Sequence, residues 1–280
     1  MANGIEKSNI DRLQNGLRKF WNTDSSYHKE ARAVNQAITR EREFVVRNLI
    51  PDKPVLDVAC GSGENSKFIE NRRYFGFDIS LIGLKMAKDY PDSALFQADI
   101  SHIPFGDNCF NNVICTYSLE HFIFVERALN EMWRVIDKGG ILSLVYPNYG
   151  DYFFMVPPSL KKKPVFKRLN YLAKQFFRKI ASSVGLTRYC FPIITNPDIL
   201  DPGVRFESDN DTTFSPSTLE LKNFFESLGA EEIQTNYYRP VFKKPWLKYF
   251  KTNLGSIMRS VYFAIPFFKY QHCGLIVVKK

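Results

Sequence analysis

A glycine-rich turn is the part of this sequence whose residue types and spacing most clearly permit chemistry. The apolar run 55–58 contains Asp57 and continues into Ala-Cys-Gly61-Ser-Gly63. Glycines allow a tight turn after a strand and let the backbone approach a ligand at the carboxyl end of a sheet. Nucleotide-binding and nicotinamide-binding folds share such a turn, so by itself it predicts a nucleotide-like ligand without choosing among them.

The residues around the turn favour a ligand that carries a positive charge. Ser66 stands where the dinucleotide fingerprint has Gly or Ala, and Asp57 and Glu64 flank the turn. Carboxylates at a helix start oppose a pyrophosphate by about 0.3–1 kcal/mol each, whereas an ammonium group tolerates or gains from them. Asp57 is also unusual within a buried strand, although a turn or cap residue is the alternative interpretation.

Two further aspartates end the next two strand-like segments. Asp78 lies 15 residues after Gly63 and can accept two hydrogen bonds from ribose hydroxyls. Asp99 can accept a hydrogen bond from the exocyclic amine of adenine while Ile100 packs on the ring. Either aspartate alone could be a helix cap. Three acids at the ends of three successive strands indicate one adenosyl-binding site instead.

Together these motifs resemble those of class I S-adenosylmethionine-dependent methyltransferases. Val55–Gly63 looks like the first motif, Gly76–Ser80 like the second and Ala98–Phe105 like the third. Tyr117–His121 and Glu131–Val135 are similar to signatures of the subgroup that modifies small molecules, lipids and sugars. The resemblance implies S-adenosylmethionine as the cofactor, with these cofactor-binding residues: Asp57, Gly61, Gly63, Asp78, Ile79, Asp99, Ile100 and Tyr117.

The resemblance is dense over residues 50–148 and loose over 211–238 and 270–279. It departs from the family pattern at Ala59, Asn111 and Asp137-Lys138, none of which is one of the three acids or the two glycines. The family implies a Rossmann-like α/β fold, with a mostly parallel seven-stranded sheet whose last strand is antiparallel.

The elements that must position these residues can be read from the apolar pattern. Strand-like and helix-like segments alternate up to Pro147, which predicts a parallel sheet with helices on both faces. The strands are expected at 55–58, 74–77, 94–96, 112–117 and 141–146, and the helices at 64–71, 81–88 and 124–136. A helix at 216–228 and strands at 232–237 and 273–278 then complete the sheet.

We expect a single methyltransferase domain over residues 1–280. A helical lid occupies 1–50, and the cofactor-binding core occupies 51–148. The proline-rich segment 149–210 and the segment 239–268 are insertions that cap the site. Residues 211–238 and 269–280 supply the rest of the sheet.

Methyl transfer to oxygen, our first expectation, needs a base that removes a proton from the acceptor. His121 is the best candidate because it follows the fourth strand, where the methyl group should point, although structural packing under the cap is an equal alternative. His28, Tyr146, Tyr149 and Asp151 are weaker candidates. Glu131 and Arg134 are three residues apart on a helix, so we expect a structural ion pair and not a catalytic one. We expect His102 to be a surface residue. No metal-ligand spacing is evident.

Composition limits the class of protein. The 280 residues are 45% hydrophobic, and no apolar run is long enough to span a bilayer. The first residues are polar, with no secretory signal, and the five cysteines form no CxxC pair, so we expect a cytoplasmic location. Residues 1–150 hold 18 basic and 19 acidic side chains, and residues 151–280 hold 20 and 10. The whole positive excess therefore lies in the second half.

A basic segment, 161–179, holds eight Lys and Arg residues and no acid. As a helix from Val165 it places Val165, Leu169, Leu172, Phe176 and Ile180 on one face, with Lys167, Lys174 and Arg178 opposite. We favour a cap helix whose apolar face packs on the core; the alternative is peripheral contact with the inner face of an anionic membrane. The basic, aromatic stretch 243–251 suits an interface or an anionic substrate. Nucleic acid is the least favoured partner, because no nucleic-acid-binding module accompanies these charges.

The acceptor is therefore expected to be a small molecule, a glycan or a lipid-linked intermediate. Two other classes stay open. A nicotinamide-dependent oxidoreductase would use the same sheet, but Ser66 and the acids near the turn disfavour it. A catalytically silent methyltransferase-like binding protein would keep the cofactor site without a working base. The oligomeric state cannot be inferred from the sequence.

Overall fold

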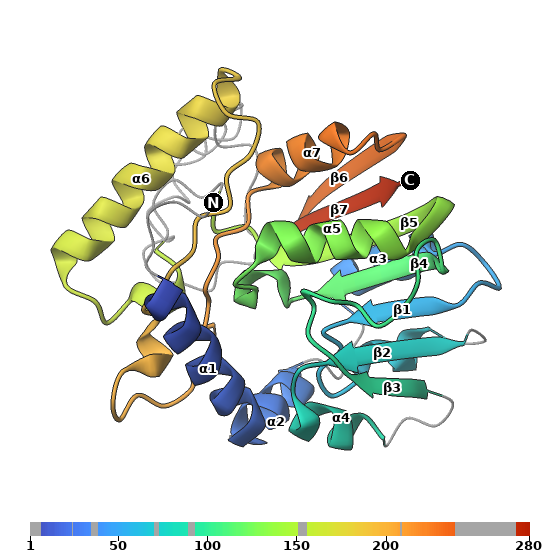
Figure 1. Cartoon of the computed structure of the whole chain (residues 1–280), viewed down its shortest axis with the longest axis horizontal. Coiled ribbons are helices and arrows are strands. Elements are labelled where there is room, and N and C mark those ends of the chain that lie inside the picture. The colour runs from blue at the N-terminus through green and yellow to red at the C-terminus, as the bar shows by residue number, and fades with distance from the viewer. Residues whose placement is uncertain are drawn as a thin grey trace, which may run out of the picture.

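The computed structural model describes residues 7–23, 25–34, 39–69, 73–88, 93–150, 156–207, 209–238 and 273–280. Its centre is a seven-stranded sheet in the order β3-β2-β1-β4-β5-β7-β6 (Figure 1). The strands are β1 (Val55–Val58), β2 (Tyr74–Asp78), β3 (Ser93–Gln97), β4 (Phe110–Thr116), β5 (Ile136–Pro147), β6 (Glu232–Tyr238) and β7 (Cys273–Lys279).

The first five strands pair in parallel, and β7 pairs antiparallel with both β5 and β6. The predicted fold class is thus confirmed, including the antiparallel last strand. In this sheet the antiparallel strand β7 lies between β5 and β6. A dinucleotide-binding fold has the strand order 3-2-1-4-5-6, in which no antiparallel strand separates strands 5 and 6. The topology therefore argues against the nicotinamide alternative.

Helices cover both faces of the sheet, which gives three layers. The side chains of β1 alternate between the two faces of the sheet. Leu56 and Val58 pack in the cluster that contains side chains of α5 (Val125–Val135) and α7 (Thr218–Ser227). Val55 packs on the other face with Val45 of α3 (Arg40–Asn48). Successive strand residues point to opposite faces, so a strand buried on both sides must be apolar almost throughout.

The helix expected at 64–71 is only a single 3-10 turn, Glu64–Phe68. Gly63 has φ of 78° and starts the turn, and the amides of Ser66 and Ile69 bond carbonyls three residues back. Such i→i+3 bonds make a tight, short helix. The helix expected at 81–88 is present as α4 (Leu81–Ala87). The strand expected at 141–146 begins earlier, at Ile136, and runs to Pro147.

The N-terminal region forms three helices, as expected for 1–50. α1 (Lys7–Thr23) and α2 (Ser25–Val34) contact α4, and α3 lies behind the sheet (Figure 1). Leu13 and Leu17 of α1 are fully buried against Ile123 of the core and Ile199 of the insertion. The first helix therefore packs against both the segment that follows β4 and the segment 193–206.

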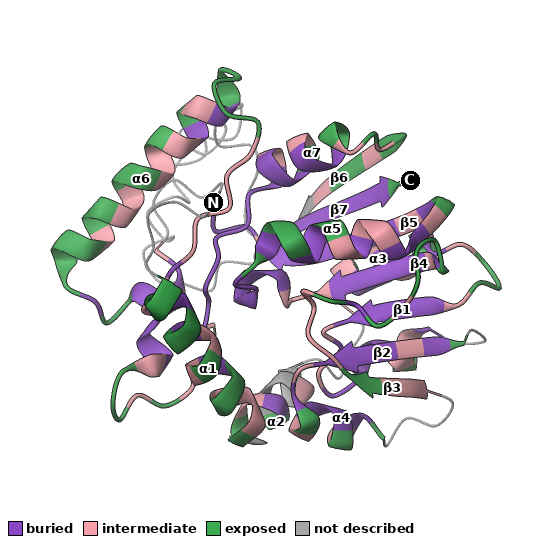
Figure 2. Ribbon diagram, in the orientation of Figure 1, coloured by how far each residue is buried: buried purple, intermediate pink, exposed green. Residues whose placement is uncertain are grey.

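The orientation of α6 (Val165–Ser183) is not the one we expected. Val165, Leu169 and Ile180 are exposed, Leu172 and Phe176 are half-buried, and Lys179 is buried. Figure 2 shows exposed and half-buried residues over most of α6. The favoured interpretation, an apolar face packed on the core, is wrong for this helix. Its inward side is polar because Arg178 forms a buried ion pair with Glu220. The insertion 239–268, including 243–251, lies outside the described residues. Among the helices that are described, none is both long and apolar enough to cross a bilayer.

Candidate active site

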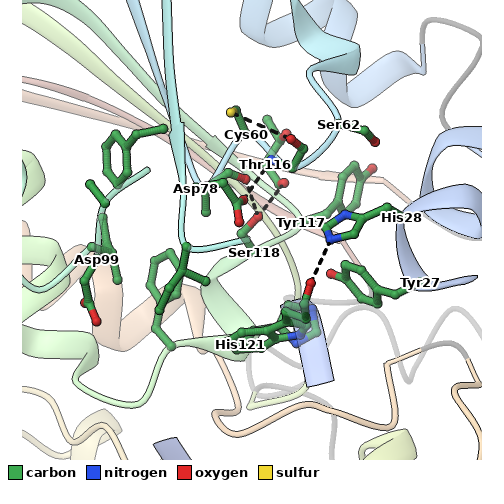
Figure 3. A pocket seen from close by; sticks show the side chains of 18 of the residues that line it. Tyr27, His28, Cys60, Ser62, Asp78, Asp99, Thr116, Tyr117, Ser118 and His121 are labelled. Atoms are coloured by element: carbon green, nitrogen blue, oxygen red, sulfur yellow. Dashed lines mark hydrogen bonds between the residues drawn. The ribbon is translucent and has the colours of Figure 1, made fainter. Parts of the chain in front are cut away.

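A cavity opens at the carboxyl ends of β1, β2 and β4, where the lid helices α1 and α2 meet the sheet (Figure 3). Parallel strands place their carboxyl ends at one edge, so the loops that follow them converge there. Of the predicted cofactor-binding residues, six line this cavity: Gly61, Asp78, Ile79, Asp99, Ile100 and Tyr117. The structure therefore brings together groups spread over 57 positions of the sequence, from Gly61 to Tyr117.

Asp78 ties the glycine turn to the end of the second strand. Its Oδ2 accepts the amide N–H of Gly61 at 2.8 Å, and its Oδ1 accepts that of Ser80 at 2.7 Å. Gly61 has φ of 54°, which favours glycine. Burial raises the pKa of Asp78, and the backbone donors of Ser80 and Gly61 oppose this. The carboxylate is thus held by its neighbours at the rim where a ribose hydroxyl could reach it.

Asp57 and Gly63 do not line the cavity. Asp57 is fully buried, and its Oδ2 accepts hydrogen bonds from Tyr74 and from Asn65, at 2.9 Å for Asn65. Burial raises the pKa of Asp57 to about 7, although the Tyr74 and Asn65 donors lower it. Asn65 itself lines the cavity and accepts from Nε of Arg42 at 3.0 Å. Asp57 therefore reaches the cavity only through Asn65.

Arg42 is a cavity residue that the sequence did not reveal. It comes from α3, is buried, and its guanidinium also lies 5.8 Å from the ring centre of Phe68. Burial lowers its pKa, while Tyr117 and Asp57 oppose that change. Nothing in the spacing of 40–48 distinguishes Arg42 from the other basic residues of this helix. Only the packing of α3 against the glycine turn places it in the site.

His121 lies on the cavity wall among carboxylates. Its Nδ1 is 3.4 Å from Oδ2 of Asp211, and its Nε2 is 3.7 Å from Oε1 of Glu120. Burial alone would lower the pKa of His121, but Asp211, Glu120 and Asp209 together raise it. The contact between His121 and Asp211 is electrostatic, because Nδ1 of His121 has no hydrogen-bond partner among the described residues; it places a carboxylate beside a candidate proton acceptor.

The two aspartates of this cluster were missed by the sequence reasoning. Asp209 and Asp211 lie about 90 positions after His121, in the segment that the amide of Thr213 ties to the carbonyl of Glu120 at 2.8 Å. Oδ2 of Asp211 accepts from the indole of Trp21 at 2.9 Å, and Oδ2 of Asp209 from the hydroxyl of Tyr149 at 2.6 Å. Tyr149 is therefore a partner of the cluster.

Glu120 is almost fully buried. Burial raises its pKa to about 8, which His121 opposes and Asp209 reinforces. Its Oε2 has no hydrogen-bond partner among the described residues.

The other candidate bases have different places. Nε2 of His28 lies 2.7 Å from the hydroxyl of Ser80, which links α2 to the loop after β2. Tyr146 is fully buried away from the cavity, with its hydroxyl on Thr218 at 3.0 Å. His102 is exposed, as predicted, and Asp151 lies outside the described residues. Glu131 and Arg134 form the predicted ion pair at 2.8 Å.

Aromatic side chains complete the acceptor side of the cavity. Trp21 and Tyr27 from the lid meet His121 edge-on, with ring centres 6.3 and 6.5 Å apart. Tyr27 also packs edge-on against Phe206 of the insertion at 4.9 Å. In Figure 3 Asp99 lies on the far side of the cavity from Tyr27 and His28. The cavity thus has one end that holds Asp99 and an aromatic end, with His121 at the latter.

One imidazole and two carboxylates are also a donor set for a divalent cation. Ligand atoms of Glu120, His121 and Asp209 all lie within 4.8 Å of one another. An oxygen of Asp209 accepts a hydrogen bond from Tyr149, and an oxygen of Asp211 accepts one from Trp21. This arrangement is compatible with a hydrogen-bonded network that transfers protons and also with a metal site. Removal of metal ions therefore has to be tested directly.

A family model described as a methyltransferase domain matches residues 56–144. This range holds β1 to β4 and most of β5, with the glycine turn, Asp78, Asp99 and His121. The match covers less than half of the chain, and over these residues it agrees with the resemblance to class I methyltransferases. S-adenosylmethionine is the methyl donor of that class, which confirms the cofactor expected from the motifs.

Similar proteins agree with the methyltransferase domain. The chain is 32% identical over 127 residues to the demethylmenaquinone methyltransferase of Corynebacterium urealyticum, covering 41% of this chain and 55% of that one. It is 26% identical over 196 residues to the ubiquinone/menaquinone biosynthesis C-methyltransferase of Haemophilus ducreyi, covering 66% of each. A solved S-adenosylmethionine-dependent methyltransferase of Mesorhizobium loti shares the fold, with a TM-score of 0.52, 14% identity and coverage of 86% and 98%.

The chain spans about half the length of the first curated relatives that it matches. These alignments do not support our expectation of an oxygen acceptor, because the Haemophilus ducreyi relative is named as a C-methyltransferase. The comparisons thus indicate a methyltransferase domain over part of the chain. They do not identify the acceptor.

Proposed function

We propose that this protein transfers a methyl group from S-adenosylmethionine to a carbon atom of a small molecule that has an acidic hydroxyl, such as a quinol. The observation that carries the proposal is the position of His121, paired with Asp211, at the aromatic end of a cavity whose other end holds Asp78 and Asp99. We also propose that the lid 1–50 and the insertions 149–210 and 239–268 enclose the acceptor within one domain.

The residues of the cavity fit the cofactor. Asp78 suits the ribose hydroxyls, and Asp99 with Ile100 suits adenine. Arg42 offers a cation to a carboxylate. Oδ1 of Asp57 is buried and has no hydrogen-bond partner among the described residues, so it adds negative potential behind the turn, which favours an ammonium group. Asp57 is in this proposal a positioning residue that acts through Asn65.

The choice of carbon as the target rests on the relative named as a C-methyltransferase, and the acceptor side of the cavity offers the base that such a reaction needs. The bound cofactor supplies an electrophilic methyl group on a sulfonium. His121 takes the hydroxyl proton of the acceptor, and the resulting oxyanion shares its charge with the adjacent ring carbon. Bound S-adenosylmethionine would supply the methyl group to that carbon, with S-adenosylhomocysteine as the leaving group. The methylated ring would then lose its ring proton to water, and protonated His121 would return the hydroxyl proton to the carbonyl oxygen, which restores the aromatic quinol. The raised pKa of His121, caused by Asp211 and its neighbours, makes it a stronger base once it is neutral.

Cofactor binding is tested by calorimetry with S-adenosylmethionine, S-adenosylhomocysteine and NAD. We expect heat with both sulfur ligands and none with NAD. Asp78→Ala should weaken the binding of S-adenosylhomocysteine about 100-fold or more, since two hydrogen bonds to a charged group are worth about 3–6 kcal/mol. Asp11→Ala, at an exposed position of α1, is the control. Heat with NAD alone would overturn the proposal.

The acceptor is tested by mass spectrometry with labelled S-adenosylmethionine and a set of quinols, catechols and amines. Carbon methylation leaves both hydroxyls of a quinol free and removes one ring proton, which proton NMR of the product detects. A methyl ether would reassign the reaction to oxygen. No product from any acceptor, with normal cofactor binding, would favour the catalytically silent alternative.

A further inference from the structure

The helix α6 concentrates most of the exposed apolar surface of the described chain. Ten large hydrophobic side chains are exposed among the described residues, and seven of them lie between positions 165 and 186. Phe166 and Phe177 are each 67% exposed and Leu169 is 60% exposed. Single exposed hydrophobic residues are normal, whereas a cluster of this kind marks an interaction surface.

These side chains form one continuous stripe. Val165, Leu169, Ile180 and Val184 recur at helical spacing, with Phe166 and Phe177 on the same side. In Figure 2 the helix runs along the edge of the molecule, with exposed and half-buried residues over most of its length. The structure thus leaves the apolar stripe of an amphipathic helix facing outward.

Polar contacts on the inward side hold this orientation. Arg178 Nη2 lies 2.6 Å from Oε2 of Glu220, and the two side chains are 9% and 2% exposed. The hydroxyl of Tyr171 bonds that of Ser215, and Ser182 is buried against Glu220. Turning the apolar stripe inward would break a buried ion pair, which is strongly unfavourable.

The charge around the stripe is positive throughout. Residues 161–197 contain nine Lys and Arg residues and no Asp or Glu. Lys162, Lys163 and Arg178 are paired with acids elsewhere in the chain. Lys161, Lys167 and Lys174 are exposed, and no salt bridge to an acid is found for them in the described structure. An apolar stripe edged by such lysines is complementary to a surface with an apolar interior and anionic headgroups.

We propose that α6 docks the protein on an anionic phospholipid bilayer. A second copy of the chain fits less well, because two such helices would bring like charges together. A nucleic acid would meet the lysines but offers no partner for the valine, leucine and isoleucine side chains. A bilayer satisfies both groups at once, and the inference does not depend on the identity of the methyl acceptor.

The test is co-sedimentation of the full chain with phosphatidylcholine vesicles that contain about one third phosphatidylglycerol, compared with pure phosphatidylcholine. We expect binding to the anionic vesicles only, weakened by high salt. Reversing Lys161, Lys167 and Lys174 to Glu should lower the partition coefficient by at least about 100-fold, since each lysine contributes about fivefold. The control, Lys53→Glu with Lys85→Glu and Lys138→Glu, changes the same charge away from α6.

The apolar part of the surface is tested separately. Phe166→Ser with Leu169→Ser should also abolish vesicle binding, whereas Leu81→Ser should not. Phe166→Trp should show a blue-shifted emission that brominated lipid quenches. The proposal is overturned if the wild type does not bind the anionic vesicles. It is overturned equally if the control triple variant loses as much vesicle binding as the variant with Lys161, Lys167 and Lys174 reversed. It is also overturned by a dimer that Phe166→Ser dissociates, by retention of DNA or RNA in place of vesicles, or by a fall in melting temperature without an effect on sedimentation.

Discussion

Replacing Glu120 by Gln should stabilise the protein at alkaline pH and not at acid pH. Burial raises the pKa of Glu120 to about 8, from an ordinary value of 4.5. A raised pKa in the folded state means that stability is fully present below pH 4.5 and is lost as the pH rises through about 8. A difference of this size corresponds to about 5 kcal/mol, which is comparable to the whole stability of a small domain.

The assay is urea unfolding of the wild type and the variant at several pH values between 4 and 9. The advantage of Glu120→Gln should grow across that range to a few kcal/mol, because glutamine keeps the size of the side chain and cannot ionise. Glu131→Gln is the control with the opposite sign, since Arg134 lowers the pKa of Glu131 and its charge stabilises the fold above the ordinary pKa. An equal difference at pH 5 and pH 9 would refute the reasoning for Glu120.

Three further predictions concern the site and the core. His121→Ala should lower kcat by about 10²–10⁴-fold with a small change in KM. The rising limb of the wild-type pH–rate profile should lie above the ordinary histidine pKa, because Asp211 and Glu120 raise the pKa of His121. A rising limb below the ordinary value would contradict the assignment of His121 as the base. Excess chelator should leave turnover unchanged, and a loss restored by a divalent cation would reassign the cluster to a metal ion. Gly274→Ala should destabilise the fold by about 1–3 kcal/mol in thermal unfolding, because its Cβ would overlap the buried ring of Tyr146, whereas Gly106→Ala should be tolerated.

The sheet, and the meeting of Asp78 and Asp99 at one cavity, could be predicted because their signals are local. Each strand has its own apolar run, and Asp78 and Asp99 directly follow two of these runs. In a parallel sheet the strand ends converge whatever the rest of the chain does, so sequence order alone implied their proximity. The same logic was wrong only in detail, since Asp57 and Gly63 stand behind the turn instead of lining the cavity.

Residues brought in from distant segments could not be predicted in this way. Arg42 enters from the lid, and Asp211 reaches His121 across 90 positions, through the contact of Thr213 with Glu120. No periodicity links such positions, because their proximity depends on how an insertion folds back on the core.

The basic helix α6 shows most clearly which properties depend on the sequence alone and which depend on the tertiary structure. Its sequence determined that α6 is amphipathic and positive, since both properties depend only on residue type and spacing within the helix. It did not determine which face turns inward. That was decided by the tertiary structure, where Glu220 of α7 forms a buried pair with Arg178 and thereby leaves Phe166 and Leu169 at the surface. An unpaired buried charge is costlier than an exposed apolar stripe, so the ion pair decides the orientation.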